Sequence, residues 1–191
     1  MSSLFANFSH IVLDDESGSV RYFPDCVAPA LAQRWFETLR EQVAWNSFRR
    51  VMYEREVDVP RLVATFDLNA AHVPEPIRAA RAVAERFSAH VFNSVGVNRY
   101  RDGNDSVAPH NDRLQDLVED EPIALLSFGG TRRMLIRSKR PGEPAVPIDL
   151  EAGSLLVMSH ASQLHYTHGV AKTKAKVDPR ISVALRVRPR G

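Results

Sequence analysis

The sequence holds a single cysteine, Cys26, and no apolar run long enough to cross a membrane. One cysteine excludes an intramolecular disulfide framework and is typical of proteins kept in a reducing compartment. A membrane-spanning helix needs about 20 apolar residues in a row. The N-terminus also lacks the charged and then hydrophobic regions of a secretory signal. We therefore expect a cytoplasmic protein with no membrane partner.

Positive charge and aromatic residues are also scarce, with a net charge of +2 and an aromatic content of 8%. So small a charge excludes binding of polyanions by the surface as a whole, so any contact with nucleic acid must come from a local patch. Few aromatics exclude an extended platform for base stacking. Two basic clusters are candidate patches, although each could equally be a solvated polar face: Arg132, Arg133, Arg137, Lys139 and Arg140, and Lys172, Lys174 and Lys176.

The composition otherwise suits one globular domain, with 44% hydrophobic and 25% charged residues in a chain of 191. Apolar residues at helical spacing predict a helix that begins near Pro29 and a second one opened by Pro74 and Pro76. Alternating or continuous apolar runs predict strands, and a further edge strand within residues 4–13. The predicted strands cover residues 20–23, 48–52, 61–66, 91–100, 123–128, 134–137, 154–159 and 180–185, with a loop at 140–147.

The most informative segment contains His110 and Asp112, two residues apart. If this segment is extended, both side chains point to one face, because strand side chains alternate. An imidazole and a carboxylate are two-thirds of the facial triad that holds non-haem Fe(II) and leaves positions open for a co-substrate and dioxygen. A lone His-x-Asp also occurs by chance in surface loops, so the assignment depends on a second histidine. On spacing alone His160, His165 and His168 are all candidates.

Two arginines on the last predicted strand suggest a co-substrate. Arg180 and Arg186 are six residues apart, an even number, so both face the same way. Two guanidinium groups on an inner face need anionic partners, and a dicarboxylic acid such as 2-oxoglutarate supplies them. The alternative is a solvated edge strand with both arginines in water.

Two helices followed by many strands predict an α+β chain that is mainly β. With metal ligands on separate strands, the pattern suits a double-stranded β-helix, or jelly roll, with the N-terminal helices packed on one sheet. We expect one domain over residues 1–191. Residues 1–90 would supply substrate-side strands and two helices, and residues 91–191 the catalytic core.

Together these motifs resemble the AlkB family of Fe(II)- and 2-oxoglutarate-dependent dioxygenases, and within it the short nucleic-acid demethylases. The similarity runs from about Tyr22 to the end of the chain. The residues that carry it are Pro60-Arg61-Leu62, Phe92-Asn93, Asn98-Arg99-Tyr100-Arg101-Asp102-Gly103, His110-Asn111-Asp112, Ser127-Phe128-Gly129, His168-Gly169-Val170 and the Arg180 and Arg186 pair.

The resemblance implies a jelly-roll fold and selects His168 as the third iron ligand, since that histidine directly precedes Gly169-Val170. It also implies that 2-oxoglutarate contacts Asn98, Tyr100, Arg180, Ser182 and Arg186. Arg180 would pair with the far carboxylate, and Arg186 would lie nearer the chelating end. Ser182 stands where many repair members carry asparagine, so we expect a weaker contact there. His165 would orient a ligand or a substrate group.

By the same resemblance, the co-substrates are 2-oxoglutarate and O₂, bound with Fe(II), and the reaction removes an N-methyl group from a base as formaldehyde. Bases of the 1-methyladenine or 3-methylcytosine type in DNA or RNA are the implied substrates, in single strands or flipped from a duplex. We expect a monomer. The alternative is an oxygenase of the same fold that hydroxylates a protein side chain or a small molecule.

On the substrate side the sequence departs from the family pattern. Repair members often carry an acidic residue just after His-x-Asp, whereas here Arg113 and Leu114 follow and the nearest carboxylate is Asp116. The segment after Pro60-Arg61 is short and lacks the tyrosine-bearing hairpin of those relatives. The candidate substrate contacts are therefore Tyr53, Arg61, Phe66, Arg113 and Asp116.

Overall fold

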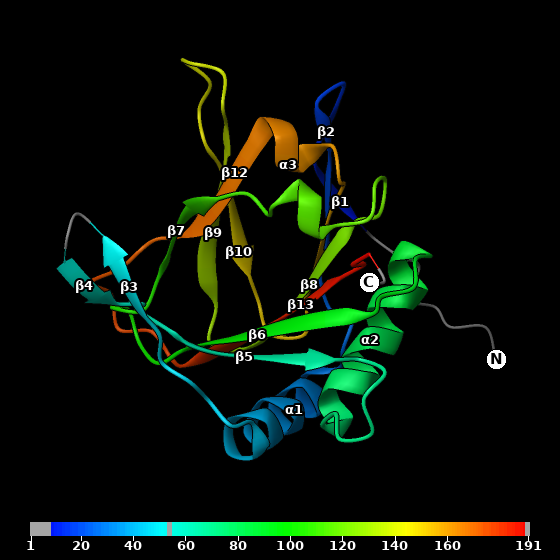
Figure 1. Cartoon of the computed structure of the whole chain (residues 1–191), viewed down its shortest axis with the longest axis vertical. Coiled ribbons are helices and arrows are strands. Elements are labelled where there is room, and N and C mark those ends of the chain that lie inside the picture. Colours follow the sequence, from blue (N-terminus) through cyan, green and yellow to red (C-terminus); the bar gives the residue numbers. More distant parts are fainter. Residues whose placement is uncertain (1–8, 53–54, 190–191) are drawn as a thin grey trace.

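Two antiparallel sheets face each other across the centre of the molecule (Figure 1). The structure is a computed structural model that describes residues 9–52 and 55–189. The larger sheet has the strand order β1 (His10–Asp15), β2 (Gly18–Phe23), β11 (Leu155–Met158), β8 (Ile123–Gly129), β13 (Arg180–Arg186), β6 (Ser94–Tyr100) and β5 (Leu62–Asp67). The smaller sheet has the order β10 (Val146–Leu150), β9 (Arg132–Ser138), β12 (Tyr166–Val170) and β7 (Val107–His110).

The remaining elements are a separate hairpin and four helical segments. The hairpin consists of β3 (Arg49–Met52) and β4 (Arg55–Asp58). The helical segments are α1 (Pro29–Gln42), α2 (Glu75–Ser88), the 3₁₀ turn η1 (Leu114–Asp116) and the short α3 (Ser162–His165). None of the described helices is long and apolar enough to cross a membrane. The predicted mainly β jelly roll is confirmed.

Alternation along β13 assigns one face of the larger sheet to packing and the other to the site. Ile181, Val183 and Leu185 belong to a core cluster shared with the two long helices. Ala184 belongs to a second cluster, shared with residues of the smaller sheet. Since strand side chains alternate, the even positions Arg180, Ser182 and Arg186 face the space between the sheets.

Helices α1 and α2 cover the outer face of the larger sheet, where they contact β8 and β13 (Figure 1). The four buried residues of α1 lie on one side of that helix: Ala32, Trp35, Phe36 and Leu39. Both helices carry proline in the first turn, as the sequence predicted. Helices α1 and α2 therefore lie on the face of the larger sheet that points away from the space between the sheets. They were expected among the substrate-side elements of residues 1–90, but in this position they do not face the site. They support the sheet from behind.

Four of the described strands are missing from the predicted ranges: β7 and β12, which were expected only as carriers of the metal ligands, and β10 and β4. Strand β10 occupies part of the predicted loop at 140–147 and contains Pro147. It is the edge strand of the smaller sheet, where a proline is tolerated because one side of the strand needs no partner. Strand β4, with the sequence Arg-Glu-Val-Asp, has a single apolar residue and so gives no strand pattern. The predicted edge strand within 4–13 is β1, although residues 4–8 lie outside the described part of the chain.

Candidate metal centre

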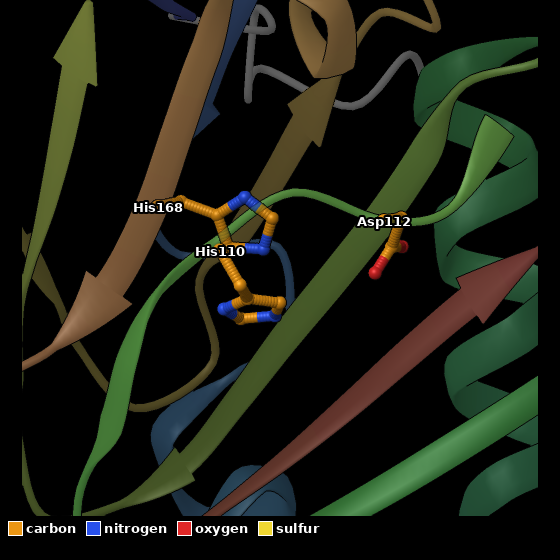
Figure 2. Close-up of side chains that lie close together, drawn as sticks. All are labelled: His110, Asp112 and His168. Carbon is orange, nitrogen blue, oxygen red and sulfur yellow. The ribbon is translucent and has the colours of Figure 1, made fainter. Parts of the chain in front are cut away.

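Two histidines and one carboxylate gather at the edge of the smaller sheet. His110 ends β7 and pairs in register with His168 of β12, and their ring centroids are 4.4 Å apart. Asp112 lies on the loop that continues from β7 (Figure 2). One ligand atom from each of the three lies within 4.8 Å of the others, close enough for all three to bind one cation. The structure therefore brings together the three predicted ligands, even though β7 ends before Asp112.

The ring orientations and charges of the triad suit a divalent cation. Nδ1 of His110 lies 3.0 Å from the carbonyl oxygen of Ala108, which favours the tautomer with Nδ1–H and leaves Nε2 for a metal. Burial, reinforced by the neighbouring His110, lowers the pKa of His168 to about 3, so its imidazole is neutral at pH 7. Burial alone would raise the pKa of Asp112, but the pairing with Arg186 outweighs burial and lowers the pKa overall. A neutral His168 and an ionised Asp112 are the states in which these two side chains bind a divalent cation.

Asp112 is held at both its carboxylate and its backbone. Arg186 donates to the two carboxylate oxygens, from Nε at 2.6 Å and from Nη2 at 3.1 Å. The Oε1 atom of Gln163 accepts the backbone N–H of Asp112 at 3.0 Å. Gln163 is only 1% exposed, and its Nε2 donates to Oγ of Ser162 at 3.1 Å. Gln163 thus fixes a loop that belongs to no strand, and no motif in the sequence marks this residue.

Arg180 has a buried guanidinium group with unmet hydrogen-bonding capacity. Its exposed fraction is 1%, and its Nη2 donates to Oγ of Ser127 at 2.8 Å. Its Nε and Nη1 atoms have no hydrogen-bond partner within the described residues. Buried donors without partners are costly, and a carboxylate can accept from two guanidinium nitrogens at once. A carboxylate ligand between the sheets is therefore the partner that this side chain lacks.

The other predicted co-substrate residues surround Arg180 on the same faces. Tyr100 is 4% exposed, and its ring centroid is 5.2 Å from the guanidinium carbon of Arg180. Asn98 and Ser182 are paired in register on β6 and β13, and Nδ2 of Asn98 donates to Oγ of Ser182 at 3.4 Å. The sequence predicted these neighbours. Ser127, whose hydroxyl accepts from Arg180, lies in a segment that carries the family resemblance, but the sequence assigned it no role.

A cavity of about 730 Å³ opens beside the triad. It is lined by consecutive residues of β5 and β6, by Asp112 and Arg186, and by residues of the segment that follows Asp112. The predicted substrate contacts Arg113 and Asp116 both line this cavity. Gly96 is at its floor, where an added Cβ would meet only Nη1 of Arg186, at 3.7 Å. The cavity is large enough for a nucleobase and has polar groups along one wall.

The other predicted substrate contacts have different surroundings. Arg61 donates from Nε to Oδ1 of Asn98 at 2.9 Å, so it braces the co-substrate wall. Phe66 borders the cavity, but its ring packs with the helix-side core, because β5 alternates and Phe66 pairs with Val95. Phe66 thus lies at the border of the cavity with its ring partly buried, and its contact with substrate stays a prediction. Tyr53 lies outside the described residues.

His165 and one of the basic clusters also need correction. The His165 side chain is exposed at the end of α3, and within the described residues Gln163 is the α3 side chain that bonds to the triad loop. Arg132, placed in the first basic cluster, is 3% exposed and donates to the backbone carbonyls of Asp102, Asp105 and Ala171. It is therefore unavailable to phosphate. The alternation of β9 turns this residue inward.

Comparisons with known proteins agree with this geometry. The family model described as 2OG-Fe(II) oxygenase superfamily matches residues 19–187. The DNA oxidative demethylase ALKBH2 of Bos taurus is 31% identical over 179 residues, which cover 82% of this chain and 64% of that protein. The alpha-ketoglutarate-dependent dioxygenase alkB homolog 3 of Homo sapiens is 30% identical over 183 residues, covering 86% and 64%. The chain thus spans less than two thirds of the length of either relative. These identities, together with the family match, confirm the predicted resemblance to the AlkB family.

Solved structures show the same fold at low sequence identity. A prolyl-4-hydroxylase of Pseudomonas putida superposes with a TM-score of 0.61 at 16% identity, covering 90% of this chain and 93% of that one. A 2OG-Fe(II) oxygenase family protein of Burkholderia pseudomallei gives a TM-score of 0.62 at 11% identity, covering 90% and 89%. Identities this low extend the agreement to the fold alone.

Replacing Gln163 with leucine should weaken metal binding without unfolding the chain. Leucine has a similar size but cannot accept the N–H of Asp112, so the loop that carries this ligand loses its anchor. We expect the affinity for Mn²⁺ to fall by roughly 10- to 100-fold, the usual effect of losing a group that orients a ligand. Electron paramagnetic resonance titration measures the affinity, and a thermal melt checks the fold. Gln33→Leu, the same change at a side chain bonded to Glu37 on α1, serves as the control. Equal affinities in all three proteins would contradict the role of Gln163.

Acid should destabilise the metal-free protein through His168. Its pKa is about 3 when folded and near 6.5 when unfolded, so between these values the unfolded chain binds more protons. The free energy of unfolding should therefore fall as the pH is lowered, by about 2 kcal/mol between pH 6.5 and pH 4.5 from this residue alone. Urea unfolding in the presence of a chelator measures this change, and His168→Asn should show a correspondingly shallower dependence. The same slope in both proteins would mean that His168 titrates normally.

Proposed function

We propose that this chain, which belongs to the 2OG-Fe(II) oxygenase superfamily, is an oxidative demethylase of N-alkylated bases in DNA or RNA. The unpaired guanidinium of Arg180, in the space between the sheets that the triad borders, is the observation that carries the proposal. The two nitrogens of Arg180 that lack a partner can donate to a carboxylate bound near the metal site, and 2-oxoglutarate has such a carboxylate. The substrate class follows from the similarity to proteins named DNA oxidative demethylase ALKBH2 and alkB homolog 3.

In this proposal His110, Asp112 and His168 hold Fe(II) and leave its remaining positions open. The bound iron, with 2-oxoglutarate and O₂, would supply the oxidising power that converts an N-methyl group to a hydroxymethyl group, which leaves as formaldehyde. The chain supplies position and charge. Arg186 keeps Asp112 ionised and oriented, and Gln163 fixes the loop from which Asp112 projects.

The residues that surround the expected position of 2-oxoglutarate would each have a different role. Arg180 would receive the far carboxylate of 2-oxoglutarate, with Ser127 holding the third nitrogen of the guanidinium in place. Tyr100 closes one side of this position and excludes water, since it is almost fully buried. Asn98 and Ser182 lie between Arg180 and the metal end, where short polar groups can bond to the co-substrate without blocking it.

The target base would enter the cavity of about 730 Å³ next to Asp112. A base in a duplex must first leave the stack, at a cost of roughly a few kcal/mol, and less in a single strand. We therefore propose single strands or flipped bases as substrates, acted on by a cytoplasmic monomer. Asp116, which lines this cavity, would accept a hydrogen bond from the exocyclic amine of a base.

Arg180→Lys should raise the KM for 2-oxoglutarate. Lysine keeps the positive charge but loses the fork that makes two parallel bonds to a carboxylate. Loss of one such charged bond predicts an increase of roughly 10- to 100-fold in KM with little change in kcat. Succinate formation at varied 2-oxoglutarate concentrations measures both constants. Arg133→Lys, at an exposed arginine on β9, is the control. An unchanged KM would show that another group holds the far carboxylate.

The decisive assay uses short DNA and RNA strands that carry 1-methyladenine or 3-methylcytosine. Each strand is incubated with Fe(II), ascorbate and 2-oxoglutarate, and mass spectrometry follows the loss of one methyl group. We expect loss only with intact protein and co-substrate, and none with His110→Ala, because the triad is then incomplete.

The relative rates on the strands would rank DNA against RNA. No loss of methyl mass, with succinate still released, would reject the nucleobase as substrate. The alternative oxygenase, acting on a protein side chain or a small molecule, would then take its place.

A further inference from the structure

A second cavity, of about 670 Å³, lies on the outer side of the smaller sheet. It is bordered by β7, by the outward positions Leu135 and Arg137 of β9, by the residues that end β12, and by the segment before β5. The inward neighbours Met134 and Ile136 belong to the core between the sheets. Because β9 alternates, this cavity is therefore separate from the co-substrate space.

The two cavities meet at the triad. Arg113 lines both of them. His110 lines the second cavity, whereas Asp112 lines the first. Since the ligand atoms of these two residues lie within 4.8 Å of each other, the metal position is at the junction. A chain of linked units lying in the second cavity would thus deliver one unit to the first.

The walls of the second cavity differ from those of the first in charge. Among its described lining residues the charged side chains are Arg61, Arg113, Arg137 and Lys172, and there is no carboxylate. The first cavity has three aspartates among its lining residues: Asp67, Asp112 and Asp116. Arg113, Arg137 and Lys172 are exposed, and their side chains form no ion pair or hydrogen bond with any described residue. These three cations are available to an anionic ligand.

Arg133 provides a contrast to Arg137, because its charge is neutralised by an ion pair. It lies on the same strand and the same face as Arg137, yet it donates to both carboxylate oxygens of Asp149, at 2.7 Å each. Arg137, by contrast, keeps an unpaired charge where the second cavity opens. Between the three unpaired cations the wall includes the apolar residues Val107, Pro109 and Leu135. Cations spaced around an apolar floor match a sugar–phosphate chain, whose phosphates carry charge and whose sugars do not.

We propose that this groove binds the sugar–phosphate backbone of the strand that presents the target base to the first cavity. The inference rests on the proposed function, because it takes a polynucleotide as substrate. Arg137 and Lys172 would contact phosphates, and Arg113 would lie where the strand turns toward the metal. Such contacts position a strand without reading its sequence. An acidic polypeptide is the competing occupant.

The test compares Arg137→Gln, Lys172→Gln and the double variant with Arg133→Gln in the full chain. All three single changes remove one positive charge, but only Arg133 is already neutralised by a partner. Fluorescence anisotropy follows binding of an unmodified single-stranded oligonucleotide at several salt concentrations. Each groove variant should reduce the slope of log K against log salt by about 0.7, the value for one phosphate contact with a single strand. The double variant should lose roughly tenfold in affinity at low salt, with Arg133→Gln close to the unsubstituted protein.

Turnover supplies the second measurement. The groove variants should raise the KM for a methylated oligonucleotide while leaving kcat unchanged, and they should act normally on the free methylated nucleoside, which has no backbone. Equal losses in Arg133→Gln and in the groove variants would overturn the proposal, since net charge alone would then explain binding. Tighter binding of a polyglutamate peptide than of the oligonucleotide, reduced by the same variants, would also overturn it.

The binding measurement separates this inference from the proposed function. Salt-dependent binding that needs Arg137 and Lys172, in a protein that removes no methyl group, would support the groove and reject the chemistry. Demethylation of oligonucleotides with the same KM in all variants would support the chemistry and reject the groove.

Discussion

The ion pair between Arg186 and Asp112 joins the larger sheet to the loop that follows β7, at the position where the three metal-ligand candidates meet. Asp112 projects from a loop that belongs to neither sheet, whereas Arg186 ends β13 in the larger one. Burial would otherwise raise the pKa of the carboxyl group, and a protonated Asp112 would be a poor ligand. The bidentate contact keeps the charge and fixes the direction of the carboxylate. The backbone bond from Asp112 to Gln163 removes the remaining freedom of the loop.

The same strand, β13, explains why much of this site is legible in the sequence. Because side chains alternate along the strand, Ile181, Val183 and Leu185 pack against the helices and the two arginines face the space between the sheets. The position of the arginines toward the co-substrate therefore follows from alternation. The roles of Gln163 and Ser127 follow from no such alternation, although Ser127 lies in a segment that resembles the family. Each acts through one hydrogen bond across the fold, and neither residue type is rare enough to attract notice.

Spacing alone also left the third ligand open among three histidines. Pairing of β12 with β7 settles it, since His168 is opposite His110 in the register, whereas His165 belongs to the exposed end of α3. Register is a property of two strands, so one strand's sequence does not contain it. The buried imidazole of His168 and the buried guanidinium of Arg180 are both unfavourable in an apolar core without partners. Ligands bound between the sheets would supply the charge and the hydrogen bonds that these two side chains lack.

Separation of charge between the two cavities follows from the chemistry that each would host. A base needs hydrogen-bonding groups of both signs and little net charge, and the first cavity mixes aspartates with arginines. A phosphate chain needs unpaired cations and tolerates no carboxylate nearby, and the described wall of the second cavity meets both conditions. The chain's net charge of +2 is therefore no argument against a polyanionic partner, because the acidic residues are kept away from this one groove. Local placement of charge, rather than its sum, decides what a nearly neutral protein can bind.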